Sequence, residues 1–236
     1  MENKKQLKGI SRRHLMHLSG AGVLAAGLGT KLIVPNQVTA TEVSEVTADQ
    51  ALQKLMEGNK RYVEFKRTYP DQDELRLKAV AQAQHPFAVI LGCADSRVPP
   101  EILFDEGLGD LFVIRVAGNI LDDGTLASIE FATAELGVPL VMVLGHERCG
   151  AVAATLKGDE VPGHISRLLD AIKPALEEVK GKTGNQLDNA VRANIKMVVG
   201  QITSSEPVLT ELVQQGKLKI VGGRYDLDSG AVEIIA

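Results

Sequence analysis

Phe87-Ala-Val-Ile-Leu-Gly92 is a short apolar run without polar alternation, and it ends directly at Cys93. Such a run is typical of a strand that is covered on both faces, as strands in parallel sheets are. Similar runs occupy residues 111–116, 138–145 and 218–221, and segments with helical periodicity lie between them. This alternation predicts an α/β fold with a central, mostly parallel β-sheet of about four strands, flanked by helices.

The predicted helices also begin and end at recognisable residues. Thr47-Ala-Asp-Gln50 has the composition of a capping box, and the apolar residues after it fall mostly on one helical face. Further helices are predicted at residues 125–136, 165–179, 187–202 and 207–215. Residues 224–227 and 231–235 flank a turn at 228–230 and predict a terminal hairpin, or a C-terminal edge strand added to the sheet.

The first forty residues differ from the rest of the chain, because they hold six of its 26 Lys and Arg residues and a single acid. Arg12 and Arg13 precede a weakly apolar run at residues 18–29, and residues 38–40 form an acceptable cleavage site. This pattern resembles a twin-arginine (Tat) export signal, so we expect residues 1–40 to be a signal peptide and residues 41–236 the functional domain. The expected location is the periplasm or another extracytoplasmic space.

Charge and the length of the apolar run exclude two classes of partner. The run at residues 18–29 is shorter than the roughly 20 residues of a spanning helix, so no stable membrane anchor is expected. Acids outnumber bases in the remainder of the chain, which disfavours nucleic acid as a partner. The chain has two cysteines, and a structural disulfide between Cys93 and Cys149 is one interpretation for an exported protein.

Metal binding is the other interpretation of these cysteines. Cys93 and His146 each directly follow a predicted strand, and ligands collect where parallel strands end. Cys149 lies three residues beyond His146. Two thiols and an imidazole are donors that tetrahedral zinc prefers, and three protein ligands leave its fourth position open, as in catalytic sites. The sequence therefore predicts one Zn²⁺ per subunit.

Asp95 and Arg97 follow Cys93 closely and are the candidate catalytic residues. The carboxylate of Asp95 can accept a hydrogen bond from a zinc-bound hydroxide, while the guanidinium of Arg97 keeps that carboxylate ionised and oriented. A plain structural ion pair is the alternative interpretation.

The pattern C-x-D-x-R at residues 93–97, followed by H-x-x-C at residues 146–149, resembles the beta-class carbonic anhydrases. The likeness extends from the helix near residue 51 to the last strand. It implies reversible hydration of carbon dioxide to bicarbonate by a zinc-bound hydroxide, in a homodimer or a dimer-based homo-oligomer. Two alternatives remain, namely a hydrolase of carbon disulfide or carbonyl sulfide with the same fold, and a non-catalytic zinc-binding assembly protein.

The resemblance also implies roles for individual residues. Gln84 matches a glutamine that contacts substrate oxygen, Phe112 matches an apolar wall of the cleft, and Phe131 stands where the family often has tyrosine. Gly150 completes the candidate substrate-binding set. Asp95 is implied to be a further metal ligand in closed, inactive forms. A surface position for Gln84 and core positions for the two phenylalanines are the alternatives.

Overall fold

The computed structural model describes residues 46–158 and 160–236. The predicted signal peptide at residues 1–40 lies outside the described residues. Within the described part of the chain, none of the helices combines the length and the hydropathy that crossing a bilayer requires.

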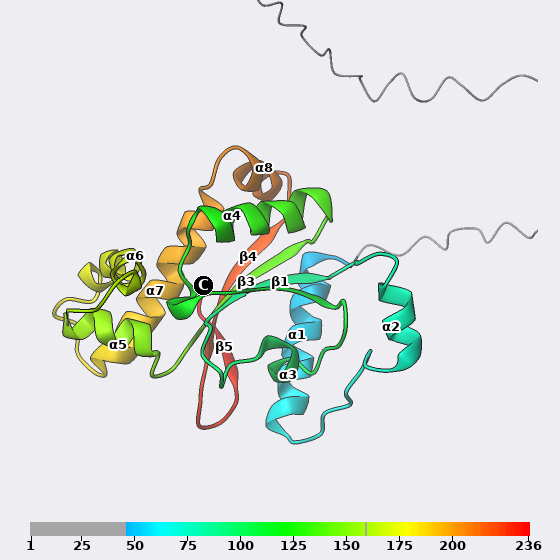
Figure 1. Cartoon of the computed structure of the whole chain (residues 1–236), viewed down its shortest axis with the longest axis horizontal. Coiled ribbons are helices and arrows are strands. Elements are labelled where there is room, and N and C mark those ends of the chain that lie inside the picture. Colours follow the sequence, from blue (N-terminus) through cyan, green and yellow to red (C-terminus); the bar gives the residue numbers. More distant parts are fainter. Residues whose placement is uncertain (1–45, 159) are drawn as a thin grey trace, which may run out of the picture. The chain divides into compact units, whose positions relative to one another are not determined.

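Five strands form a single sheet in the order β2-β1-β3-β4-β5 (Figure 1). The first four strands run parallel to one another, and β5 pairs antiparallel with β4 at one edge. The α/β fold, with its mostly parallel sheet and its added C-terminal edge strand, is therefore confirmed. The bounds of the strands are β1 Ala88–Gly92, β2 Leu111–Arg115, β3 Leu140–His146, β4 Lys219–Tyr225 and β5 Val232–Ile234.

Helices cover both faces of this sheet. Figure 1 shows α4, α6, α7 and α8 on one side of the sheet and α1 and α3 on the other. Val89 and Leu91 of β1 belong to the buried cluster on the first side, and Ala88 and Ile90 to the cluster on the second. Burial on both faces explains why β1 and β3 read as continuous apolar runs. The bounds of the helices are α1 Ala48–Val63, α2 Glu74–Val80, α3 Pro100–Leu103, α4 Asp123–Glu130, α5 Gly150–Lys157, α6 Ile165–Glu177, α7 Gln186–Thr203 and α8 Val208–Gln214.

Two local predictions need correction. The sequence predicts separate strands at residues 218–221 and 224–227, but a single strand, β4, extends from Lys219 to Tyr225 and overlaps both. A Cβ atom at Gly222 would lie 2.7 Å from Cγ2 of Ile195, so this glycine serves the close packing of α7 on the strand and does not interrupt it. The helix expected at residues 125–136 is α4, followed by a π-helical turn at Phe131–Glu135.

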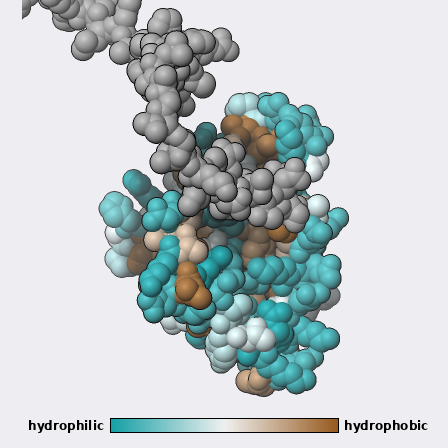
Figure 2. All heavy atoms as spheres, turned by 90° about the vertical axis from the view of Figure 1, so that its right-hand side faces the viewer, coloured by the Kyte–Doolittle hydropathy of each residue, from teal (hydrophilic) through white to brown (hydrophobic). Residues whose placement is uncertain are grey.

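The second small helix, α2, stands apart from the core. None of its residues is buried, and Leu75 and Leu77 are 76% and 56% exposed. Figure 2 views the molecule from the side on which α2 lies in Figure 1, and hydrophobic side chains there form small patches within a mainly hydrophilic surface. The helix is attached to the segment before β2 through Arg76, which donates to the carbonyl of Leu108 at 2.7 Å, while its two leucines remain on the surface.

Glu106, which follows α3, is a buried carboxylate whose charge is only partly balanced by nearby groups. The residue is 1% exposed, and Lys54 places its ammonium nitrogen 3.0 Å from one carboxylate oxygen. Neither oxygen has a hydrogen-bond partner of good geometry among the described residues. Burial therefore raises the pKa of Glu106 to about 7.

A carboxyl group with a raised pKa binds its proton more tightly in the folded chain than in the unfolded one. The free energy of unfolding must therefore fall as the pH rises from the ordinary pKa of 4.5 through about 7. Between pH 5 and pH 8 the free energy of unfolding of the parent protein should fall by about 2 kcal/mol on account of Glu106, since each pKa unit is worth about 1.4 kcal/mol. We expect Glu106→Gln, whose side chain stays neutral, not to show this fall. Urea unfolding of both proteins at the two pH values measures the difference.

Glu178→Gln is the matched control, because Glu178 is exposed. It should follow the parent protein at both pH values. An identical pH dependence for Glu106→Gln and the parent would contradict the assignment of this loss to Glu106.

Candidate metal centre

Two strand ends and one helix start converge at the carboxyl edge of the sheet. Cys93 directly follows β1, and His146 is the last residue of the neighbouring strand β3. Cys149 is the N-cap residue of α5, which begins at Gly150. Residues 93 and 146, far apart in the sequence, therefore meet because β1 and β3 are parallel neighbours.

These three side chains form a buried cluster of donors. Their ligand atoms all lie within 4.8 Å of one another, and Cys93, His146 and Cys149 are 4%, 0% and 1% exposed. Both cysteines are free thiols, so the disulfide interpretation is not the arrangement observed.

The tautomer of His146 is fixed by its surroundings. Nδ1 lies 2.9 Å from the carbonyl oxygen of Glu147 and donates to it, which leaves Nε2 as the atom with a free lone pair. Nε2 is buried and has no partner in the described part of the chain. An unpartnered imidazole nitrogen beside two sulfurs fits a cation, and this donor set is the one that tetrahedral zinc favours.

The two buried thiols lie close enough to shift each other's pKa. The hydrogen bond from Cys149, helped by the backbone N–H of Gly118 at 3.3 Å, lowers the pKa of Cys93 to about 4. Donating that bond, together with burial, raises the pKa of Cys149. A divalent cation that binds both sulfurs would balance the charge of two thiolates, so metal binding would relieve the cost of burying these groups together.

Asp95 and Arg97 form the predicted pair at the edge of this cluster. Nε and Nη2 of Arg97 donate to the two carboxylate oxygens of Asp95 at 2.9 and 2.8 Å, and the backbone N–H of Arg97 donates at 3.0 Å. These bonds hold the pKa of Asp95 well below its usual range. Its Oδ2 lies 3.8 Å from Nε2 of His146, but the carboxylate is not one of the three groups whose ligand atoms lie mutually within 4.8 Å.

Two further residues at this edge are absent from the set predicted from the sequence. Arg115, the last residue of β2, donates to the backbone carbonyls of Cys93 and Asp95 at 3.0 and 2.6 Å. Gly118 donates its N–H to the sulfur of Cys93 and has a φ of 75°. The sequence does contain a signal for them, because the end of a third parallel strand must lie at the same edge as the other two.

The substrate-binding candidates lie in different places. Phe112 and Phe131 are together, with ring centroids 6.5 Å apart, and Phe131 is 49% exposed. Gly150 is the exposed first residue of α5, directly after Cys149. Gln84 is exposed and precedes β1, and a strand of this length spans roughly 16 Å. Gln84 and the metal ligands of the same chain therefore lie at opposite edges of the sheet.

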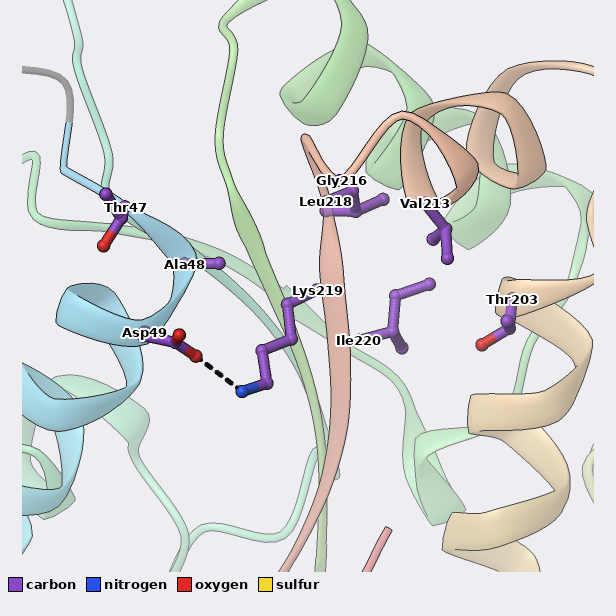
Figure 3. A pocket seen from close by; sticks show the side chains of 9 residues that line it. All are labelled: Thr47, Ala48, Asp49, Thr203, Val213, Gly216, Leu218, Lys219 and Ile220. Atoms are coloured by element: carbon purple, nitrogen blue, oxygen red, sulfur yellow. Dashed lines mark hydrogen bonds and ion pairs between the residues drawn. The ribbon is translucent and has the colours of Figure 1, made fainter.

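A separate pocket lies at that opposite edge. It has a volume of about 520 Å³ and is lined by the start of α1, the end of α7, α8 and the start of β4 (Figure 3). Within it Lys219 pairs with Asp49 at 2.6 Å. None of the three candidate ligands lines this pocket, so it is separate from the candidate metal site.

Comparison with known proteins agrees with this geometry. Residues 88–232 match the sequence model of the family described as carbonic anhydrase. A carbonic anhydrase of Mycolicibacterium smegmatis is 39% identical, with 78% of this chain and 91% of that protein covered, and carbonic anhydrase 2 of Mycobacterium tuberculosis is 38% identical, with 76% and 89% covered.

Solved structures extend the likeness to the fold. The β-carbonic anhydrase CafA of Aspergillus fumigatus superposes with a TM-score of 0.62 at 29% identity, over 79% of this chain and 89% of that one. The matched region contains the sheet and all three candidate ligands. This chain therefore belongs to the beta-class carbonic anhydrases.

Proposed function

We propose that this protein catalyses the reversible hydration of carbon dioxide to bicarbonate and a proton, at a Zn²⁺ held by Cys93, His146 and Cys149. The observation that carries the proposal is the buried, unpartnered Nε2 of His146 beside the two thiol sulfurs. When bound by three protein ligands, zinc supplies an open position and lowers the pKa of water there to near neutrality.

The chain's own residues then orient the reaction. An ionised carboxylate can only accept hydrogen bonds. Asp95 would therefore accept a hydrogen bond from the O–H group of the nucleophile and so orient a lone pair of its oxygen toward carbon dioxide. Arg97 keeps Asp95 ionised and fixed through three hydrogen bonds. The same bonds favour this role for Asp95 over that of a fourth metal ligand. From the resemblance to the family, we propose Phe112, Phe131 and Gly150 as the residues that line the approach of carbon dioxide.

Stopped-flow hydration, followed with a pH indicator, tests the proposal. The zinc-loaded protein should accelerate hydration, lose the activity when a chelator removes the metal, and regain it when zinc is restored. Parallel assays of carbon disulfide and carbonyl sulfide consumption separate the alternative substrates. Stoichiometric zinc without acceleration of any of the three reactions would reject an enzymatic role.

We propose in addition that the functional unit is a homodimer or a dimer-based homo-oligomer. The position of Gln84 supports this proposal. The residue is too distant from the metal site of its own chain to serve it, and it is exposed, so a second subunit could reach it. Ile102, Leu108 and Phe131 expose 47%, 44% and 49% of their surface, which gives the subunit apolar side chains to bury in an interface.

A complementation experiment tests this arrangement. We expect Gln84→Ala alone to lower kcat/KM about tenfold, the effect of one lost substrate hydrogen bond. A heterodimer is then made in which one subunit carries Gln84→Ala and the other carries Cys149→Ser. If Gln84 is shared, the Cys149→Ser subunit supplies its intact Gln84 to the intact zinc site of the Gln84→Ala subunit. The two subunits are co-expressed with different tags, and the heterodimer is purified. Its activity should exceed the mean activity of the two variant homodimers. Activity at or below that mean would contradict sharing of Gln84 between subunits.

We propose finally that residues 1–40 direct export by the twin-arginine route, and that residues 41–236 act in the periplasm or another extracytoplasmic space. The Arg12-Arg13 pair, the weakly apolar run and the small residues at 38–40 support this. Replacing both arginines by lysine should leave the protein in the cytoplasmic fraction. An unchanged distribution between fractions would reject this route.

A further inference from the structure

The turn between the two metal ligands His146 and Cys149 contains a residue in an unfavourable backbone conformation. Arg148 has a φ of 52°, in the left-handed region that long side chains rarely adopt. Such a conformation costs free energy and persists only where the surrounding structure holds it. The structure must therefore contain a contact that compensates for the backbone of Arg148.

That contact is a two-pronged ion pair across the edge of the sheet. Nη1 and Nη2 of Arg148 donate to the two carboxylate oxygens of Asp228 at 2.9 and 2.7 Å. The side chains are 48% and 73% exposed, so the pair contributes little to the stability of the whole fold. Its geometry, by contrast, fixes the direction in which Arg148 leaves the backbone.

Asp228 is itself held in a rigid turn. The backbone N–H groups of Asp228 and Ser229 both donate to Oδ1 of Asp226, at 3.1 and 2.9 Å. The buried Asn59 of α1 donates to the carbonyl of Gly230 at 2.9 Å and accepts from the N–H of Val232 at 2.9 Å. The turn between β4 and β5 is thus anchored to α1, and it offers Arg148 a fixed partner.

The turn between His146 and Cys149 has further attachments to the sheet. The carboxylate of Glu147 lies 3.9 Å from Nη2 of Arg224 in β4, and the N–H of Glu147 donates to the carbonyl of Tyr225 at 2.9 Å. These contacts fix the end of the turn that adjoins His146, whereas the ion pair of Arg148 fixes the end that adjoins Cys149. We propose that Arg148 is a positioning residue, which, through Asp228, keeps Cys149 in place for the metal and slows zinc release. The inference rests on the proposed zinc site.

Zinc release from the loaded protein into an excess of a chromogenic chelator tests the inference. We expect Asp228→Asn to raise the release rate about threefold to tenfold, since it removes the charge but hardly changes the shape. Arg148→Gly should do the same, although glycine accepts the backbone conformation without strain. Asp170→Asn, which breaks an exposed pair with Lys173 on α6, should leave the rate unchanged.

The exchanged pair, Arg148→Asp with Asp228→Arg, should restore most of the slow release, because aspartate tolerates a positive φ and the ion pair re-forms. The visible spectrum of the cobalt-substituted protein should shift in Asp228→Asn and return in the exchanged pair, a response that a general loss of stability would not give.

Wild-type release rates in both Asp228→Asn and Arg148→Gly would overturn the inference, as would an exchanged pair without rescue. Release is measured without turnover, so a protein that binds zinc but does not hydrate carbon dioxide refutes the proposed function and leaves this test intact. A wild-type protein that retains no zinc refutes both.

Discussion

Cys149→Ser is expected to abolish zinc binding and to reduce hydration to the rate of buffer alone. The sulfur of Cys149 is one of three ligand atoms that lie within 4.8 Å of one another, and the residue is 1% exposed, so the substitution removes one of the three buried donors. A serine hydroxyl keeps its proton at neutral pH and is a poor zinc ligand beside a thiolate and an imidazole.

The fold should survive this substitution. Cys149 occupies the N-cap position of α5 without making a side-chain capping bond, and serine is among the preferred N-cap residues. Zinc content by mass spectrometry, circular dichroism and a hydration assay on the same sample separate loss of metal from loss of fold. Ser166→Ala, at an exposed position on α6, is the control and should keep both zinc and activity. Full zinc content in Cys149→Ser would show that Cys149 is not a metal ligand.

Asp95→Asn is expected to keep its zinc and to lose activity by about 10²-fold to 10³-fold, the range for an oriented group that handles a proton in the reaction. The amide has the size of the carboxylate but carries no charge, and its nitrogen presents hydrogens where Asp95 presents lone pairs. The two side-chain bonds from Arg97 then meet only one acceptor oxygen.

Zinc content and kcat/KM, measured together, decide this prediction. Asp49→Asn is a matched control, because Asp49 is also a carboxylate paired with a cation, Lys219, but lies at the opposite edge of the sheet. Increased activity in Asp95→Asn would mean that the carboxylate normally closes the metal site, as the non-catalytic alternative requires. Unchanged activity would show that Asp95 does not orient the nucleophile.

The sequence predicts the sheet and the three metal ligands because both follow from local patterns. Buried parallel strands produce apolar runs, and residues directly after such runs must lie at one edge of the sheet. The sequence alone therefore places Cys93 and His146 together. The merging of two predicted strands into β4 could not be predicted, because Gly222 reads as a break unless the close approach of Ile195 is known.

The supporting residues depend on contacts that no local pattern records. Arg148 meets Asp228 eighty positions away, and Arg115 reaches Cys93 from the neighbouring strand. Glu106 is of a residue type that is mostly exposed, yet it is buried beside Lys54. Gln84 precedes β1 and lies at the opposite edge of the sheet from the metal ligands of its own chain, which is why we propose that it serves a second subunit. These positions are properties of the assembled tertiary structure.

The zinc K-edge X-ray absorption spectrum of the purified protein tests the central claim most directly, because it counts the atoms around the metal. Cys93, Cys149 and His146 predict two sulfur neighbours at about 2.3 Å and two nitrogen or oxygen neighbours at about 2.0 Å, one of them from the open position. A shell of nitrogen and oxygen alone, or of a single sulfur, would contradict the account.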